Sequence, residues 1–490
     1  MGEVGAPILD QKHLNFRMLL LKSRQDDGDE ALGPDLDTSV VADIDGGKTM
    51  SMVKVFMDSI TRRLLVLGVG ATSLLVGAFG VSAQQYKGEI FHPMLVTRTG
   101  PFASAASGVS SGQQDYFALV NATGGVEGYK IVWEECEFEY KVPRALECYE
   151  RYKGKWKVVY PNSTPAIYAL AERVTKDEVL AINLAGGRSD STDGQTFPYL
   201  APVVNNFWAQ AASTIRYLAQ LEGGESKLKG KKIAYIHLDN DYGRQPFPMF
   251  DELAKKYGFE WKSWPLAWPA LEQSSAWVDM ARRYRADYIV GWLYGQSCNV
   301  PYTEMQKVGF PREKYIATLW CGSEEDIGPA GPLAVGAVTA NYHGTGKDWP
   351  VIQEIIEKVH KQGKGNIEAA RVGTVAYNRG VITGIVIVEA FRNAIKSQGA
   401  PLDGKKVRDG YRMIKLTNER LAELGAKGMM PQLVFSEKYH GGVDPQIFQK
   451  WDGTKWTVVS DWIMPYEDIV WAKIEESAEA FRKQTKAAAK

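Results

Sequence analysis

Hydroxyl and amide side chains gather in an Asn-Ser-Thr-Pro stretch at residues 162–165, the clearest place for chemistry in this sequence. β-Branched and aromatic residues at 158–160 precede it and apolar residues at helical spacing follow at 167–174, which predicts a strand, a loop and a helix. Thr164 before Pro165 predicts the helix start, because a threonine hydroxyl caps free amides and a proline in the first turn loses no hydrogen bond. Free amides, the helix dipole and the hydroxyls together favour a carboxylate. The alternative is that these side chains only cap the helix.

Composition, charge and motifs argue against several classes of function, namely nucleic-acid binding, metal binding and catalysis. The chain has 490 residues, enough for two or three domains, and its 58 basic and 58 acidic side chains form no basic stripe, which argues against a nucleic-acid partner. The four cysteines and six histidines show no zinc-binding spacing, and residues 295–299 lack the closing glycine of a nucleophile elbow. A dinucleotide fingerprint is also missing from the sequence. We therefore expect no metal, no cofactor and no enzymatic activity.

The first 83 residues differ from the rest. Residues 1–49 have no sustained apolar period and many aspartates, which predicts a disordered extension or an upstream start-site artefact. Residues 50–83 combine basic residues, an uncharged apolar run at 64–80 and a small-x-small ending, which predicts a signal peptide. The alternative is a membrane anchor, since the run is long for the core of a signal peptide, although it is slightly short for a spanning helix. The mature chain is expected to begin at Gln84 in the periplasm, exported by the ordinary or the twin-arginine route.

From residue 86 onward, predicted strands alternate with predicted helices. The strands are expected at residues 89–97, 129–134, 157–160, 179–184, 232–238, 259–265, 288–293, 315–320 and 334–342. Such alternation predicts an α/β fold whose parallel sheets carry helices on both faces and bind ligands beyond the carboxyl ends of the strands. Later segments are predicted as a long helix at 370–397, a hairpin of 447–451 with 455–459, and a terminal helix from 468.

The order and spacing of these segments resemble the periplasmic solute-binding proteins of ABC importers, of the branched-chain amino-acid-binding type. The resemblance is carried by residues 99–103, 163–164, 182–187, 232–243 and the hairpin at 451–453. It implies a type I periplasmic binding protein fold, in which two doubly wound parallel-sheet lobes, joined by a three-segment hinge, close over a ligand. By this resemblance lobe 1 holds residues 86–205 plus 343–430, lobe 2 holds 206–342 plus 431–465, and 466–490 form a C-terminal helix and tail.

The residues predicted to meet the ligand lie just after predicted strands. From lobe 1 they are Phe102, Ser163, Thr164, Ala185 and Gly187, and from lobe 2 they are Tyr242, Trp292, Tyr294 and Trp320. Arg98 and Arg188 are alternative partners for a carboxylate. The small residues at 186–187 would let the backbone approach the same group.

The cysteines fit an oxidising compartment. Cys136 and Cys148 flank a loop between a predicted strand and a predicted helix and make a plausible disulfide there, and their surroundings resemble a subgroup tied to aromatic or other non-amino-acid solutes. Cys298 and Cys321 follow neighbouring predicted strands, so a second disulfide near the cleft stays open. Neither has a histidine placed to activate a thiol for catalysis.

The sequence departs from the resembled family after the strand at 315–320. Amino-acid-binding members tend to carry a glutamate there for the ligand ammonium, whereas this chain has Trp320 or Cys321, with Glu324 several residues later. Burying an unpaired ammonium is costly, so an aromatic or other hydrophobic carboxylate, handed to an ABC permease in the inner membrane, is predicted. The alternatives are a branched-chain or other amino acid or amide as ligand, or a ligand-sensing module of a receptor system. The rings could also belong to the core.

Overall fold

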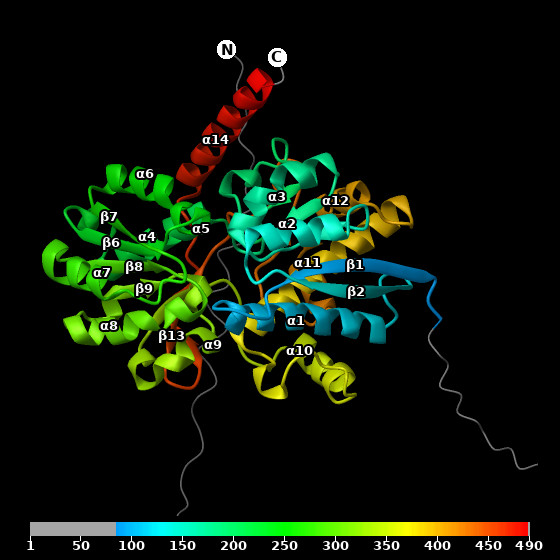
Figure 1. Cartoon of the computed structure of the whole chain (residues 1–490), viewed down its shortest axis with the longest axis horizontal. Coiled ribbons are helices and arrows are strands. Elements are labelled where there is room, and N and C mark those ends of the chain that lie inside the picture. The colour runs from blue at the N-terminus through cyan, green and yellow to red at the C-terminus, as the bar shows by residue number, and fades with distance from the viewer. Residues whose placement is uncertain (1–84, 489–490) are drawn as a thin grey trace, which may run out of the picture. The chain divides into compact units, whose positions relative to one another are not determined.

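The computed structural model describes residues 85–488, and the side chains up to residue 487. The predictions for residues 1–49 and for a signal peptide at 50–83 lie outside the described residues. The rest of the chain forms an α/β structure (Figure 1), which confirms the predicted fold class.

One group of elements contains two small parallel sheets. The first pairs β1 with β2, and the second has the order β3-β4-β5. The strands are β1 (Gly88–Val96), β2 (Tyr129–Glu137), β3 (Val158–Val159), β4 (Leu180–Ile182) and β5 (Leu200–Ala201). The helices of this group are α1 (Ala103–Ala122), α2 (Val142–Arg151), α3 (Thr164–Lys176), α10 (Pro350–Ile355), α11 (Val375–Gln398), α12 (Gly404–Arg412) and α13 (Asn418–Glu423). A short antiparallel pair, β11 (Lys415–Leu416) with β12 (Leu433–Val434), completes it.

Helices α1 and α11 of this group approach each other at glycines. A Cβ atom on Gly112 would overlap the Tyr377 carbonyl oxygen, and one on Gly380 would overlap the Val109 carbonyl oxygen. Small residues therefore let the two backbones come together. Most of α11 is buried, as expected for a helix that is apolar on nearly every side.

The second group is built on a seven-stranded sheet with the order β14-β13-β10-β9-β8-β6-β7. Its strands are β6 (Lys232–Leu238), β7 (Glu260–Leu266), β8 (Tyr288–Trp292), β9 (Tyr315–Ala317), β10 (Val338–Asn341), β13 (Ile447–Trp451) and β14 (Trp456–Val458). Its helices are α4 (Phe207–Glu222), α5 (Asp241–Arg244), α6 (Phe247–Tyr257), α7 (Ser274–Val278), α8 (Val300–Val308) and α9 (Glu324–Ile327). β6 to β10 are parallel, and β13 and β14 add to them in antiparallel orientation.

All nine predicted strands are present, and the differences in their bounds have local causes. β6 has the predicted bounds, and the hairpin of β13 and β14 places Trp451 opposite Trp456, with ring centroids 5.2 Å apart. The strand predicted at 315–320 instead ends at Ala317, because Leu319–Cys321 form a 3-10 turn. β5 was not predicted, since two residues are too short to give a periodic signal.

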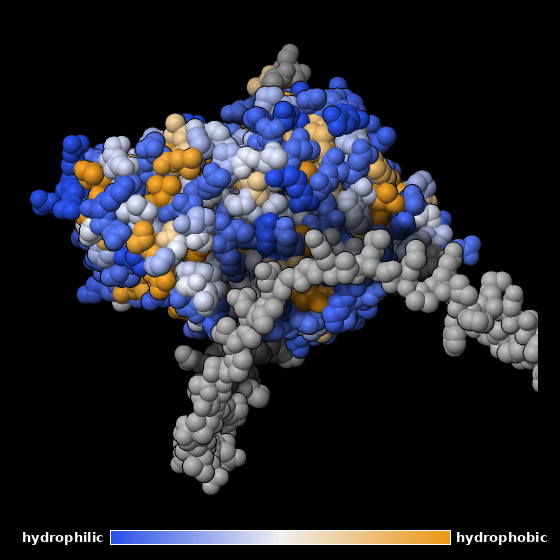
Figure 2. Space-filling model, turned by 60° about the horizontal axis from the view of Figure 1, so that its bottom comes forward, coloured by the Kyte–Doolittle hydropathy of each residue, from blue (hydrophilic) through white to orange (hydrophobic). Residues whose placement is uncertain are grey.

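The described residues end in helix α14 (Glu467–Ala488), which is seen in red in Figure 1. Ser477 donates to Asp190 at 2.8 Å, and the ring of Phe481 lies 4.7 Å from that of Phe197. Figure 2 shows a face on which hydrophilic residues surround separate hydrophobic ones. Within residues 85–488, none of the helices has the length and apolar character needed to cross a membrane.

Candidate ligand-binding site

A small cavity lies where the two groups of elements meet. Its lining consists of Tyr140, Asn162, Ser163, Thr164, Asn183, Phe207, Tyr242, Tyr294 and Trp320. Its volume is about 10 Å³, close to the room that one water molecule needs, so the lining residues lie close together in this arrangement.

The N-terminus of α3 forms the polar wall of the cavity. Ser163 is the N-cap of this helix and its side chain accepts a hydrogen bond from the Ala166 amide at 3.4 Å, so the prediction that Thr164 caps the helix is wrong by one residue. The helix begins one residue earlier because Ser163 has extended backbone and its hydroxyl reaches the Ala166 amide, while Pro165 in the first turn has no amide to satisfy. The Thr164 hydroxyl has no hydrogen-bond partner among the described residues and lies in the cavity lining. It is therefore available to a ligand.

Two asparagines add amide groups to this wall. The Asn162 side-chain nitrogen donates to the Tyr294 hydroxyl at 3.3 Å, which joins the two groups of elements across the cavity. The Asn183 side-chain oxygen is buried without a partner in the described part of the chain. Asn162 and Tyr140 both have left-handed backbone, with φ of 47° and 59°, which is rare for residues other than glycine. Such strain gathers at functional sites.

Aromatic rings form the other walls. The Phe102 ring centroid lies 4.4 Å from those of both Tyr140 and Tyr294, and 3.9 Å from that of Trp268, which is 45% exposed. The Trp320 ring meets Tyr294 at 5.6 Å, nearly perpendicular to it. These rings come from loops at the carboxyl ends of β1, β2, β7, β8 and β9, where ligands bind in parallel α/β folds.

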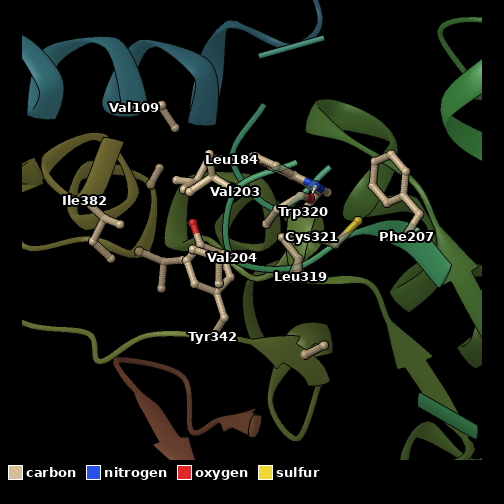
Figure 3. Packing of buried hydrophobic residues seen from close by; sticks show 14 of the residues in the cluster. Val109, Leu184, Val203, Val204, Phe207, Leu319, Trp320, Cys321, Tyr342 and Ile382 are labelled. Atoms are coloured by element: carbon tan, nitrogen blue, oxygen red, sulfur yellow. Dashed lines mark hydrogen bonds between the residues drawn. The ribbon is translucent and has the colours of Figure 1, made fainter. Parts of the chain in front are cut away.

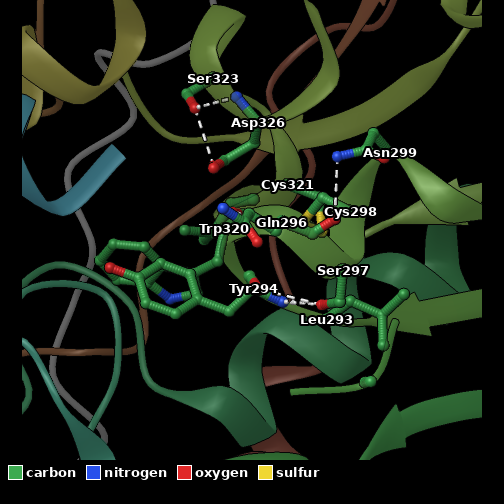
Figure 4. The surroundings of a disulfide bond; sticks show 12 residues. Leu293, Tyr294, Gln296, Ser297, Cys298, Asn299, Trp320, Cys321, Ser323 and Asp326 are labelled. Atoms are coloured by element: carbon green, nitrogen blue, oxygen red, sulfur yellow. Dashed lines mark hydrogen bonds between the residues drawn. A yellow bond between two sulfur atoms is a disulfide. The ribbon is translucent and has the colours of Figure 1, made fainter. Parts of the chain in front are cut away.

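Trp320 is held by the turn that follows β9. Its indole nitrogen donates to the Ala185 carbonyl oxygen at 3.2 Å, and a disulfide joins the next residue, Cys321, to Cys298 (Figure 4). Figure 3 shows Trp320 and Leu319 among buried residues that include Leu184 and Val203. The disulfide left open by the sequence is thus present, as is the predicted one between Cys136 and Cys148.

The nine predicted site residues fall into two sets. Those in the cavity lining are Ser163, Thr164, Tyr242, Tyr294 and Trp320. Of the others, Phe102 contacts the Tyr140 and Tyr294 rings, and the Ala185 carbonyl accepts from Trp320. Gly187 packs against Asn183, and Trp292 is 1% exposed behind Phe207 and Tyr242.

Four lining residues were not predicted: Tyr140, Asn162, Asn183 and Phe207. Two of them carried a signal: Asn162 belongs to the predicted anion-binding stretch, and Asn183 lies near the end of the strand predicted at 179–184, directly after β4. Tyr140 lies on a loop three residues beyond β2, and Phe207 begins α4, so neither stands at a predicted strand end.

Charged side chains are absent from the nine residues that line the cavity. Glu324 accepts from the Val375 amide at 2.9 Å, and Asp326 accepts from the Ser104 hydroxyl at 2.9 Å, so both point toward α1 and α11. Burial raises the pKa of each carboxyl to about 7. The site thus offers hydroxyl and amide donors and aromatic surfaces, but its lining holds no carboxylate for a ligand ammonium.

The arginines considered from the sequence have other partners. Arg98 pairs with Glu135 and donates to the Ser111 hydroxyl at 2.8 Å. Arg188 pairs with Asp190 at 2.6 Å. Neither belongs to the cavity lining.

An α/β structure of two groups of elements, with a cavity at the carboxyl ends of parallel strands, is typical of periplasmic solute-binding proteins. The model of the periplasmic binding protein family matches residues 89–455, and the chain belongs to this family. This confirms the resemblance drawn from the sequence and the type I fold. The family consists of solute-binding proteins and not of enzymes. A search of curated proteins finds no match.

Solved structures agree with this assignment. A protein of the Pseudomonas fluorescens group, described as an ABC transporter permease, is 36% identical, with a TM-score of 0.75 over 81% of this chain and 98% of that chain. A branched-chain amino acid ABC transporter protein from Thermus thermophilus with bound valine is 16% identical, with a TM-score of 0.66 over 79% and 99% of the two chains. An R. palustris solute-binding protein in complex with benzoate is 15% identical, with a TM-score of 0.61 over 77% and 97%.

Proposed function

We propose that this periplasmic ABC-transporter substrate-binding protein binds a small aromatic or other hydrophobic carboxylate between two lobes. The observation that carries the proposal is the cavity lining, which combines aromatic walls with the donors of the α3 N-terminus and holds no carboxylate. Charge-assisted hydrogen bonds to an anion contribute about 1.5–3 kcal/mol each, whereas a buried ammonium without a partner is unfavourable. A carboxylate with an apolar body therefore fits the lining better than an α-amino acid does.

Lobe closure is the mechanism we assign to binding. The ligand contacts both lobes, lobe 1 (residues 86–205 plus 343–430) and lobe 2 (residues 206–342 plus 431–465). It therefore favours the closed arrangement, which a permease recognises. The hydrogen bond from Asn162 to Tyr294 and the one from Trp320 to Ala185 join these two segments. The valine and benzoate complexes indicate that proteins of this fold hold ligands of both kinds.

Leucine and 4-methylpentanoate make a sharp test, because they differ only in the ammonium group. Titration followed by intrinsic tryptophan fluorescence is expected to give at least about tenfold tighter binding of 4-methylpentanoate than of leucine, since the site has no partner for the ammonium. Benzoate is expected to bind as well, stacked on the rings. Tighter binding of leucine would contradict the proposal and identify an amino-acid-binding protein.

We also propose that residues 50–83 serve as the signal peptide for export to the periplasm. Two disulfides support an oxidising compartment. N-terminal sequencing of the exported protein is expected to begin near Gln84. A retained apolar run at 64–80 would instead indicate a membrane anchor.

A further inference from the structure

Arg379 is a buried cation beside the cavity. It lies on α11 and is 1% exposed, and it is the only lysine or arginine that is buried in the described part of the chain. Its guanidinium donates to the Leu319 carbonyl at 2.8 Å, to the Asn341 side-chain oxygen at 3.3 Å and to His343 Nε2 at 3.3 Å. Burial lowers the pKa of His343 to about 3, so this imidazole is a neutral acceptor.

Within residues 85–488, Arg379 has no carboxylate as an ion-pair partner. This is unusual, because a buried charge is stable in proteins when it is paired. The carboxyls of Asp326 and Glu324 interact electrostatically with Arg379 but form their hydrogen bonds with other groups. The three groups that accept hydrogen bonds from Arg379 are neutral. They therefore do not cancel its positive charge, which also acts on the residues around it.

The surroundings of Arg379 include the cavity wall. The guanidinium lies 5.1 Å from the centroid of the Trp320 ring, which lines the cavity, and 5.6 Å from that of Tyr342. Its charge also reaches the hydroxyls of Tyr242 and Tyr294: burial raises their pKa well above the ordinary value, and Arg379 opposes that rise. Both tyrosines line the cavity as well. The positive charge of Arg379 thus acts on three residues of the cavity lining: Trp320, Tyr242 and Tyr294.

We infer that Arg379 determines the charge specificity of the site, by supplying a fixed positive field that favours an anionic ligand over a neutral ligand of the same shape. This inference rests on the proposed function and names the residue that sets it. Arg379 does not contact the ligand. It acts on the ligand through its electric field and through Trp320 and the turn at Leu319, which it holds in position. Arg98 and Arg188 form ion pairs with Glu135 and Asp190, so we do not assign this role to them.

The test compares charged and neutral ligands of equal shape: benzoate with benzamide, and hexanoate with hexanamide. Affinities are measured at pH 6, below the pKa of about 7 of Asp326 and Glu324, so that these carboxyls are largely uncharged. Arg379→Gln is expected to weaken binding of the two carboxylates roughly tenfold or more and of the two amides by less than about threefold. Arg379→Lys, which keeps the charge, is expected to retain the preference for carboxylates.

Arg392→Gln is the matched control. It removes a positive charge from the same helix, where Arg392 pairs with Glu127 and Glu389, and it is expected to leave all four affinities unchanged. Equal weakening of carboxylates and amides by Arg379→Gln would overturn the inference and assign Arg379 a purely structural role. So would unchanged carboxylate affinity in that variant.

Thermal unfolding shows whether each variant is folded. If Arg379→Gln does not fold, Arg379→Lys decides alone: a folded lysine variant that no longer prefers benzoate to benzamide overturns the inference, and one that keeps the preference supports it. A wild-type protein that binds none of the four ligands overturns the proposed function and this inference together. A wild type that binds benzoate and benzamide equally overturns only the role of Arg379.

Discussion

Replacing Ser163 and Thr164 together by alanine is expected to weaken ligand binding about 10–100-fold, because two hydrogen-bond donors to a carboxylate are lost at once. Both side chains line the cavity, and the Thr164 hydroxyl has no other partner among the described residues. Titration of wild type and variant with benzoate or 4-methylpentanoate measures the change. The single variant Thr164→Ala should account for much of it, since Ser163 already serves α3 as a cap.

The cap itself must be separated from the ligand contact. Losing the Ser163 cap is expected to lower the free energy of unfolding by about 1 kcal/mol whether or not a ligand binds. Thr417→Ala is the matched control, because Thr417 caps α13 through the same 3.4 Å bond to a backbone amide and does not line the cavity. It should lose stability but not affinity. An unchanged affinity in the Ser163 and Thr164 double variant would assign both residues to capping alone.

Gly112→Ala is expected to lower the free energy of unfolding by about 1–3 kcal/mol, although alanine stabilises most helix interiors relative to glycine by about 1 kcal/mol. The added methyl group would overlap the Tyr377 carbonyl oxygen of α11, which is backbone in a buried helix and has no room to move away. In Gly380→Ala the added methyl group would overlap the Val109 carbonyl oxygen in the same way, so a similar decrease in the free energy of unfolding is expected. Denaturant unfolding at equilibrium measures both changes.

Gly328→Ala provides the control for this pair. Gly328 has open space where its Cβ would lie and is not in the left-handed region, so its replacement should change the free energy of unfolding by less than about 0.5 kcal/mol. If Gly112→Ala instead stabilised the protein, α1 and α11 would have to lie farther apart than the structure places them.

Much of the fold could be predicted because its signals are local. The bounds of β6, the hairpin with its facing tryptophans and the position of α11 follow from periodicity and turn residues within short windows. The site was predicted in part for the same reason: Tyr242 and Tyr294 follow strands whose carboxyl ends meet in an α/β sheet. Tyr140 could not be found this way, because it lies on a loop after β2 with a left-handed backbone.

The sequence by itself determined the α/β class and the family, and it predicted the start of α3 to within one residue. Only the tertiary structure decided that Asn183 and Phe207 line the cavity and that Arg98 and Arg188 do not. It also placed Arg379 against the Leu319 carbonyl, a contact between residues 60 positions apart. In the sequence this arginine is one polar residue within an apolar helix, and periodicity carries no information about which distant turn such a helix will contact.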